Sequence, residues 1–143
     1  MTYQECFERG LLRKSTIERQ EIENQIKIAE NYIKKAEKIF DKELFDICFL
    51  TVYISIFHSA RALLYIKGYK ERSHYCLFEF VCVEFKDDKE IVRLAEMAQN
   101  YRTTRHLVQY DGELCSENTT KEALKDAKDF LMIAKKLIKN GGK

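Results

Sequence analysis

The sequence predicts an all-α protein, an up-and-down four-helix bundle with one or two short accessory helices. Three observations support this prediction. The chain has no proline, and its five glycines lie outside the apolar helical runs. Apolar residues recur every three or four positions in most segments, which is the spacing of one helix face. The stretch from Leu44 to Ile66 is apolar on nearly every side, as expected for a helix inside a bundle. We expect a single domain over residues 1–143.

The central stretch has one competing interpretation, which is a helix that spans a membrane. It is long enough, since a spanning helix needs roughly 20 apolar residues. However, His58 and Arg61 lie well inside it, and an arginine at the middle of a bilayer costs roughly 2.5–3.5 kcal/mol on insertion scales. Amphipathic segments also flank it on both sides. We therefore expect a buried bundle helix and no membrane association.

The N-terminal part of the chain is predicted to hold two helices before the central one. Apolar residues between positions 2 and 13 are spaced for one short amphipathic helix. Ser15 and Glu18 have the spacing of a capping box, so a second helix is expected to begin there and to end near Phe40. Asp41 is expected to begin the central helix after a tight turn. The two long helices should then be antiparallel neighbours.

The middle of the chain is predicted to form a loop followed by a short helix. Gly68 is a suitable C-cap for the central helix, and residues 68–72 form the loop. Ser73 is a suitable N-cap for a very apolar helix that ends near Phe85. Residues 80–85 are β-branched and aromatic, so a strand is the alternative. We favour the helix because the sequence offers no partner strand.

Two further helices are predicted in the C-terminal part. One begins at Asp88 and ends near Gln109, and Gly112 with the polar residues after it separates it from the next. The residues Thr119–Glu122 are expected to cap the last helix, whose apolar stripe continues to Ile138.

Composition and charge restrict the class of protein only weakly. Lys and Arg total 25 against 23 for Asp and Glu, a formal net charge of +2. This small net charge does not indicate nucleic-acid binding, and it does not exclude it. The N-terminal residues have no apolar signal-peptide core, so we expect a cytoplasmic protein.

The five cysteines give no metal or disulfide pattern. None form a Cys-x-x-Cys pair, and no histidine lies at zinc-finger spacing. Cys48, Cys76 and Cys82 have apolar neighbours, so we expect buried reduced thiols that pack as small apolar side chains. A zinc site or a redox switch is the alternative. No cofactor or metal is expected.

A polar stretch at the end of the fifth predicted helix is the best candidate for chemistry. A helical projection places Arg102, Arg105 and Gln109 in line with the apolar stripe of this helix. Because a buried unpaired charge is costly, these arginines need partners. They could bind carboxylates inside the bundle, such as Asp46 or Glu79. They could line a groove for a subunit or nucleic acid, or the helix end could emerge into solvent.

The three histidines differ in their sequence context. His106 follows Arg102 by four residues, so the two share one side of a helix, and Arg with His suits phosphodiester chemistry. His58 and Arg61 form a second pair, one turn apart. For His58 we favour a hydrogen-bonded core histidine, and for Arg61 an ion pair with a carboxylate. His74, beside the Ser73 cap, is expected to be structural.

Three segments of the chain resemble the HEPN-domain superfamily, in particular its small stand-alone prokaryotic members. They are FHSARALLYIKGYKERSHYC (Phe57–Cys76), YRTTRHLVQYD (Tyr101–Asp111) and ECFERGLL (Glu5–Leu12). The resemblance implies a four-helix bundle that forms a homodimer and works with a minimal nucleotidyltransferase partner as a toxin–antitoxin pair. It also implies that active members are metal-independent endoribonucleases. Their motif is an arginine, four to six residues and a histidine, and the sites of two subunits meet at the dimer interface.

This sequence departs from that motif. Arg102 and His106 are separated by only three residues, whereas Arg105 and Tyr110 are separated by four. Tyr110 therefore takes the place of the motif histidine, and with a reference pKa of about 10 tyrosine cannot replace histidine as a proton shuttle. We predict a non-catalytic homodimer that binds nucleotide or RNA phosphates, or its partner, through Arg102, Arg105 and Tyr110. The alternatives are a metal-independent endoribonuclease with His106 as the catalytic residue, and a purely structural dimerisation module.

Overall fold

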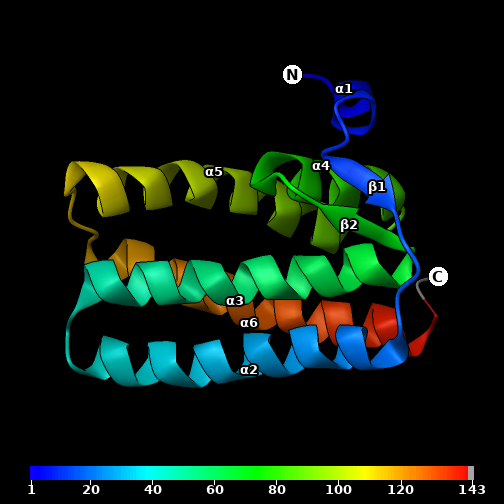
Figure 1. Ribbon diagram of the computed structural model, residues 1–143. Coiled ribbons are helices and arrows are strands. Elements are labelled where there is room, and N and C mark those ends of the chain that lie inside the picture. Colours follow the sequence, from blue (N-terminus) through cyan, green and yellow to red (C-terminus); the bar gives the residue numbers. More distant parts are fainter. Residues whose placement is uncertain (142–143) are drawn as a thin grey trace.

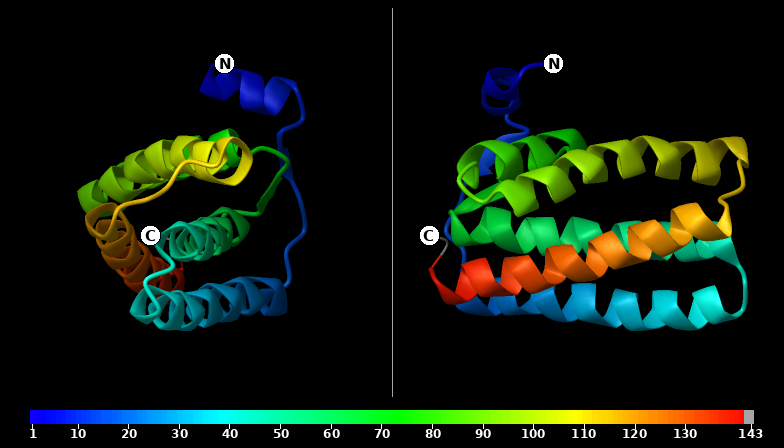
Figure 2. Two further views of the ribbon diagram at one scale, coloured as in Figure 1. Left: turned by 90° about the vertical axis from the view of Figure 1, so that its left-hand side faces the viewer. Right: turned by 180° about the vertical axis from the view of Figure 1, so that it is seen from behind.

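The computed structural model describes residues 1–141 as six helices and two short strands (Figure 1). In chain order these are α1 (Tyr3–Glu8), β1 (Leu12–Lys14), α2 (Arg19–Asp41), α3 (Phe45–Ile66), β2 (Tyr69–Glu71), α4 (His74–Glu84), α5 (Lys89–Asp111) and α6 (Glu117–Lys139). The long helices α2, α3, α5 and α6 run alternately up and down, with α4 packed on α5 and α1 across one end (Figures 1 and 2). The predicted all-α bundle is confirmed.

The helix α3 is the core of the bundle, and the other long helices pack around it (Figure 2). Its residues Phe49, Val52, Tyr53 and Ile56 are almost fully buried. Each large apolar side chain that is removed from water in this way contributes roughly 1.5–3 kcal/mol to folding. By length and hydropathy alone α3 could cross a membrane, but most of its apolar residues are buried inside the bundle. The predicted core helix is therefore confirmed.

The two strands are an addition that the sequence did not predict. Leu12 pairs with Glu71 and Lys14 with Tyr69 in an antiparallel ladder, so residues 12–13 are strand and not the end of the first helix. Gly10, at φ +70°, ends α1 early by turning the chain. The ladder holds the segment before α2 next to the end of α3. Because Glu71 belongs to β2, the ladder also fixes the position of Glu71.

Several helix boundaries differ from those predicted. Glu18, not Ser15, is the N-cap of α2, and its backbone N–H donates to Glu21 Oε2 at 2.9 Å. The expected start of α3 at Asp41 is wrong, because α2 continues to Asp41 and α3 begins at Phe45. The last helix begins earlier than predicted, with Ser116 as its N-cap.

Other predicted boundaries are confirmed. The Ser73 side chain accepts a hydrogen bond from Cys76 N, so it caps α4 as expected. Residues 74–84 are helical, which settles the helix-or-strand alternative for this segment. Gly112 ends α5 in the left-handed conformation, at φ +71°.

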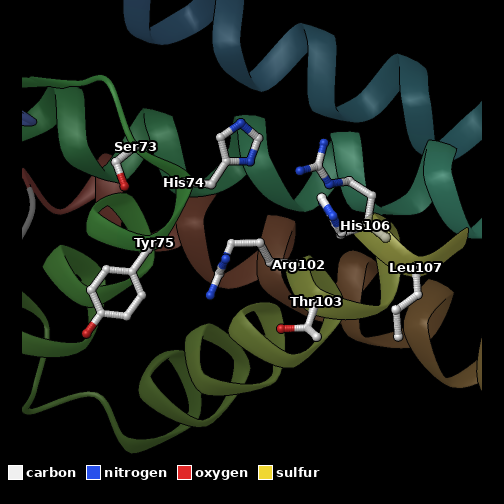
Figure 3. Close-up of a pocket in the computed structure, with 8 residues that line it drawn as sticks. Ser73, His74, Tyr75, Arg102, Thr103, His106 and Leu107 are labelled. Atoms are coloured by element: carbon white, nitrogen blue, oxygen red, sulfur yellow. The ribbon is translucent and has the colours of Figure 1, made fainter. Parts of the chain in front are cut away.

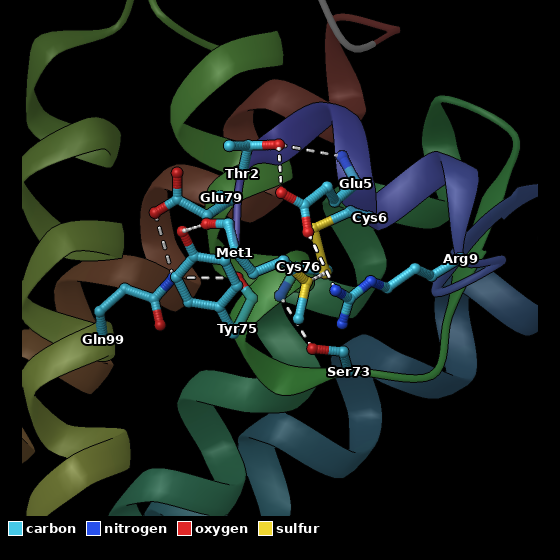
Figure 4. Close-up of a disulfide and its surroundings, with 10 residues drawn as sticks. All are labelled: Met1, Thr2, Glu5, Cys6, Arg9, Ser73, Tyr75, Cys76, Glu79 and Gln99. Atoms are coloured by element: carbon cyan, nitrogen blue, oxygen red, sulfur yellow. Dashed lines mark hydrogen bonds and ion pairs between the residues drawn. A yellow bond between two sulfur atoms is a disulfide. The ribbon is translucent and has the colours of Figure 1, made fainter.

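The prediction of a reduced thiol is wrong for Cys76. Cys6 and Cys76 form a disulfide that joins α1 to the first turns of α4 (Figure 4). The Tyr75 hydroxyl donates to the backbone oxygen of Met1 at 3.1 Å in the same area. Cys48, in contrast, is a buried free thiol, and burial raises its pKa to about 11. It therefore packs as a neutral side chain, as predicted.

Candidate functional site

A cavity of about 510 Å³ lies between the start of α4 and the second half of α5. Figure 3 shows His74 and Tyr75 on the α4 side of this cavity, and Arg102, Thr103 and His106 on the α5 side. We call it the α4–α5 cavity. Its lining comprises Ser73, His74, Tyr75, Arg102, Thr103, Arg105, His106 and Leu107. Three of the four site residues predicted from sequence are thus brought together.

Arg102 is half-buried and held by neutral groups. Its Nε donates to Gln99 Oε1 at 3.0 Å, and its guanidinium lies 5.7 Å from the centre of the Tyr75 ring. Glu79, one of the two predicted carboxylate partners, instead accepts from Gln99 Nε2 at 3.3 Å. Across residues 1–141 no carboxylate forms an ion pair with Arg102. Its charge is therefore free to meet a ligand in the cavity.

Arg105 is also half-buried and also lacks a carboxylate partner within residues 1–141. Its guanidinium lies 5.0 Å from the centre of the Tyr53 ring, which belongs to α3. Its Nε is buried and has no hydrogen-bond partner in the described part of the chain. Asp46, the other predicted carboxylate partner, does not reach it. A buried donor on a charged group without an acceptor is unfavourable, so this guanidinium is prepared for an anion from outside.

His106 and Tyr110 lie on the outer side of the same helix. His106 is exposed and lines the cavity. Tyr110 is 63% exposed and is not part of the lining, although its ring centre lies 4.9 Å from that of His106. His106 therefore belongs to the same cavity lining as the two arginines, and Tyr110 lies outside that lining, beside His106.

His74 is a site residue that sequence reasoning missed. Its Nδ1 lies 2.8 Å from the Tyr53 hydroxyl, and its ring stacks on Phe57 with centres 4.3 Å apart. Burial, reinforced by the nearby charge of Arg105, holds the pKa of His74 below its usual range. The ring is therefore neutral and fixed at neutral pH. The available signal was Ser73, whose cap sets His74 at the start of a helix.

The second histidine–arginine pair makes the contacts that were predicted for it. His58 Nδ1 lies 2.6 Å from Gln25 Oε1, and neither His58 nor Arg61 lines the α4–α5 cavity. Arg61 donates through two nitrogens to Glu71, at 2.9 and 2.8 Å. Its guanidinium also lies 4.5 Å from the centre of the Phe57 ring. These groups connect α3 to β2 and α2.

The chemistry that this arrangement supports is recognition of an oxyanion. Two guanidinium groups supply several donors without a competing carboxylate, and two imidazoles stand in the same cavity. Arginine binds phosphate through a planar fork of N–H donors. In residues 1–141 no three His, Cys, Asp or Glu side chains lie close enough together to hold a metal ion.

Comparison with known proteins identifies one family and two similar proteins. The model of the HEPN domain family matches residues 22–137. A protein of Methanocaldococcus jannaschii named "Putative toxin MJ0605" is 26% identical over 132 residues, which cover 92% of this chain and 97% of that protein. A second protein of the same organism, named "Putative toxin MJ0142", is 28% identical over 90 residues, which cover 60% of this chain and 61% of that protein.

Proposed function

This chain belongs to the HEPN domain family, and from that premise we propose that it is a toxin-type protein whose α4–α5 cavity binds RNA or nucleotide phosphates. Two similar proteins carry the name of a putative toxin, which supports the toxin class. One observation carries the ligand class, namely that Arg102 and Arg105 line one cavity without a carboxylate partner within residues 1–141.

The physical reason is the difference between a paired and an unpaired guanidinium. An arginine with a carboxylate partner is already neutralised, and a phosphate must displace that partner before it binds. Arg102 and Arg105 need no such displacement, because their neighbours are a glutamine and two tyrosine rings. A hydrogen bond between charged groups is worth about 1.5–3 kcal/mol, so two such groups support measurable affinity.

The test is the binding of a fluorescent single-stranded RNA oligonucleotide by the wild type, Arg102→Ala and Arg105→Ala. We expect each variant to bind about ten-fold more weakly and to lose about one unit of the salt-dependence slope. Arg93→Ala is the matched control, since Arg93 lies on the same helix, outside the cavity, and pairs with Glu90 at 2.7 Å. Equal affinity in all four proteins would contradict the proposal and favour a structural dimerisation module.

We also propose that the chain forms a cytoplasmic homodimer and that a minimal nucleotidyltransferase is its partner. The support is the family resemblance of the segments around Phe57–Cys76 and Tyr101–Asp111. Light scattering is expected to give twice the chain mass of 17.0 kDa. Co-expression with a nucleotidyltransferase encoded by a neighbouring gene is expected to yield a stable complex. A monomeric mass and separate elution would contradict these two assignments.

A second candidate function is a metal-independent endoribonuclease, and the position of His106 favours it. His106 lines the same cavity as both arginines, so an imidazole could transfer a proton while a guanidinium stabilises charge on the phosphate. The test is cleavage of single-stranded RNA in EDTA by the wild type and His106→Ala. Cleavage by the wild type that falls at least about 100-fold in the variant supports this function. No cleavage by the wild type, or equal cleavage by both, excludes it.

A further inference from the structure

A second cavity adjoins the α4–α5 cavity and shares two of its residues. It has a volume of about 350 Å³ and lies between α3 and the end of α5. We call it the α3–α5 cavity. Its lining comprises Leu50, Tyr53, Ile54, Phe57, His58, His74, Arg105 and Gln109. His74 and Arg105 belong to both cavities, so these two side chains form the wall between them.

The two cavities differ in chemical character. The α4–α5 cavity holds both unpaired arginines and is rich in polar groups. The α3–α5 cavity is lined mainly by the aliphatic and aromatic side chains of one face of α3, among them Leu50, Ile54 and Phe57. Its polar groups are those of His58 and Gln109, the two shared side chains and the hydroxyl of Tyr53. A cationic compartment that suits an anion thus adjoins an apolar compartment with a few polar groups, and this pair suits a ligand with one anionic end and one apolar end.

The wall between the cavities is held in place on both sides. His74 is fixed by the Tyr53 hydroxyl at 2.8 Å and by stacking on Phe57. The guanidinium of Arg105 lies against the ring of the same Tyr53, at 5.0 Å. Because Tyr53 is almost fully buried in α3, it anchors both wall residues to the rigid core. The two compartments therefore keep a fixed separation.

We infer that the two cavities together hold one nucleotide of a single-stranded RNA, with the phosphate in the α4–α5 cavity and the base in the α3–α5 cavity. This inference rests on the proposed function and specifies its ligand. A base has apolar faces and polar edges, which matches an apolar compartment with a glutamine amide and an imidazole at hand. The His58 Nδ1 is engaged by Gln25, which leaves Nε2 for a base edge. A base enters such a compartment only when it is unstacked, as in a single strand.

The test compares three probes that add one part of a nucleotide at a time. They are inorganic phosphate, ribose 5-phosphate and adenosine 5′-monophosphate, titrated by NMR. For the wild type we expect the nucleotide to bind about ten-fold or more tightly than ribose 5-phosphate, since contacts of a base with apolar and aromatic groups contribute at least that factor. Arg102→Ala, which changes only the α4–α5 cavity, is expected to weaken all three probes about equally.

Two variants of α3 separate the base compartment from the rest. Ile54→Trp and Leu50→Trp each fill the α3–α5 cavity, and both are expected to reduce nucleotide affinity to that of ribose 5-phosphate while leaving the two smaller probes unchanged. Ile47→Trp is the matched control. Ile47 lies two helical turns before Ile54 on the same helix, is 47% exposed and lines neither cavity. It is expected to bind all three probes like the wild type.

The outcomes distinguish this inference from the proposed function. If ribose 5-phosphate binds and the nucleotide gains nothing over it, the phosphate site stands and the base compartment is refuted. If the nucleotide still binds more tightly than ribose 5-phosphate in both tryptophan variants, the base compartment is also refuted, since the base would then lie elsewhere. If none of the three probes binds, the proposed function fails at the phosphate, and the inference fails with it. Equal affinity for single-stranded and duplex RNA would contradict the requirement for an unstacked base.

Discussion

Two regions of the molecule hold their arginines in opposite ways. Where α3 meets β2, Arg61 makes a two-pronged ion pair with Glu71, whose side chain is only 5% exposed. Along the second half of α5, Arg102 and Arg105 have no ion pair with any of residues 1–141, and each lies against a tyrosine ring. All three guanidinium groups are half-buried. The difference is therefore in their partners and not in their depth.

The comparison teaches which charges the fold requires. Arg61 neutralises a carboxylate that the β1–β2 ladder holds in a nearly buried position, so its role is complete within the chain. The charges of Arg102 and Arg105 are not neutralised from within, and the buried Nε of Arg105 lacks an acceptor. Folding alone does not explain two such groups in one cavity, whereas an anionic ligand does. The following predictions test this division.

The largest expected effect is on the paired side. Arg61→Ala should lower the free energy of unfolding by about 3 kcal/mol, because it leaves the buried carboxylate of Glu71 without a partner. Urea or guanidinium denaturation measures this change. The Arg61→Ala/Glu71→Ala double variant is the control. It should be more stable than Arg61→Ala alone, since it removes the orphaned charge. A loss below about 1 kcal/mol in Arg61→Ala, typical of an exposed pair, would contradict the assignment.

A change of pH should also act on the paired side. Burial, followed by the charge of Arg61, lowers the pKa of His58 to about 4. Between its ordinary value of about 6.5 and about 4, the unfolded chain binds a proton that the folded chain does not. The stabilisation is therefore present above pH 6.5 and is lost as the pH falls toward 4. By pH 5 the loss should reach about 1–2 kcal/mol.

A matched pair of variants isolates this histidine from other titrating groups. His58→Asn should lose less stability between pH 7 and pH 5 than the wild type, as measured by denaturation at each pH. His106→Asn should follow the wild type, because His106 is exposed on α5. An unchanged pH dependence in His58→Asn would show that other groups, such as His74, account for the acid sensitivity.

The bundle itself was predictable because its signals are local and repeated. Apolar periodicity located every long helix, and the apolar run of Phe45–Ile66 identified the core helix. Boundaries were less predictable, since Ser15–Glu18 and Glu18–Glu21 have the same capping-box spacing. The structure selects the second because Ser15 N donates to Gly68 O and extends the strand pairing. The Cys6–Cys76 disulfide joins positions 70 residues apart, and no local pattern indicates such a contact.

The site was predictable only in the part that one helix supplies. Helical spacing placed Arg102, Arg105 and His106 close together on α5, and they do line one cavity. It could not indicate that His74 completes the wall, because only the packing of α4 on α5 brings that residue across. Nor could it distinguish an arginine with a carboxylate partner from one without. That distinction depends on tertiary contacts such as Gln99 to Glu79.

The unpaired side should show an effect of opposite sign on stability. Arg105→Met keeps much of the side-chain length and removes the charge, so it relieves the desolvation of a guanidinium without an acceptor. We expect the free energy of unfolding to rise by about 0.5–1 kcal/mol, while RNA affinity falls as for Arg105→Ala. Denaturation and RNA titration of the same preparation measure both quantities. A loss of stability comparable to that of Arg61→Ala would mean that Arg105 serves the fold instead.

The smallest expected effect on stability is at an exposed ion pair, and it tests whether an ion pair must be buried to stabilise the fold. Lys70, which is next to Glu71 in β2, forms an ion pair with Glu21 at 3.0 Å, but the two side chains are 41% and 37% exposed. Because water already solvates both charges, the attraction between them is largely offset by screening and by the ordering of two long side chains. Lys70→Ala should therefore leave the denaturation midpoint unchanged within error, at low and at high salt. A loss of stability as large as that of Arg61→Ala would show that an ion pair stabilises this region whether it is buried or exposed. The contrast with α5 would then depend only on the presence or absence of a carboxylate partner.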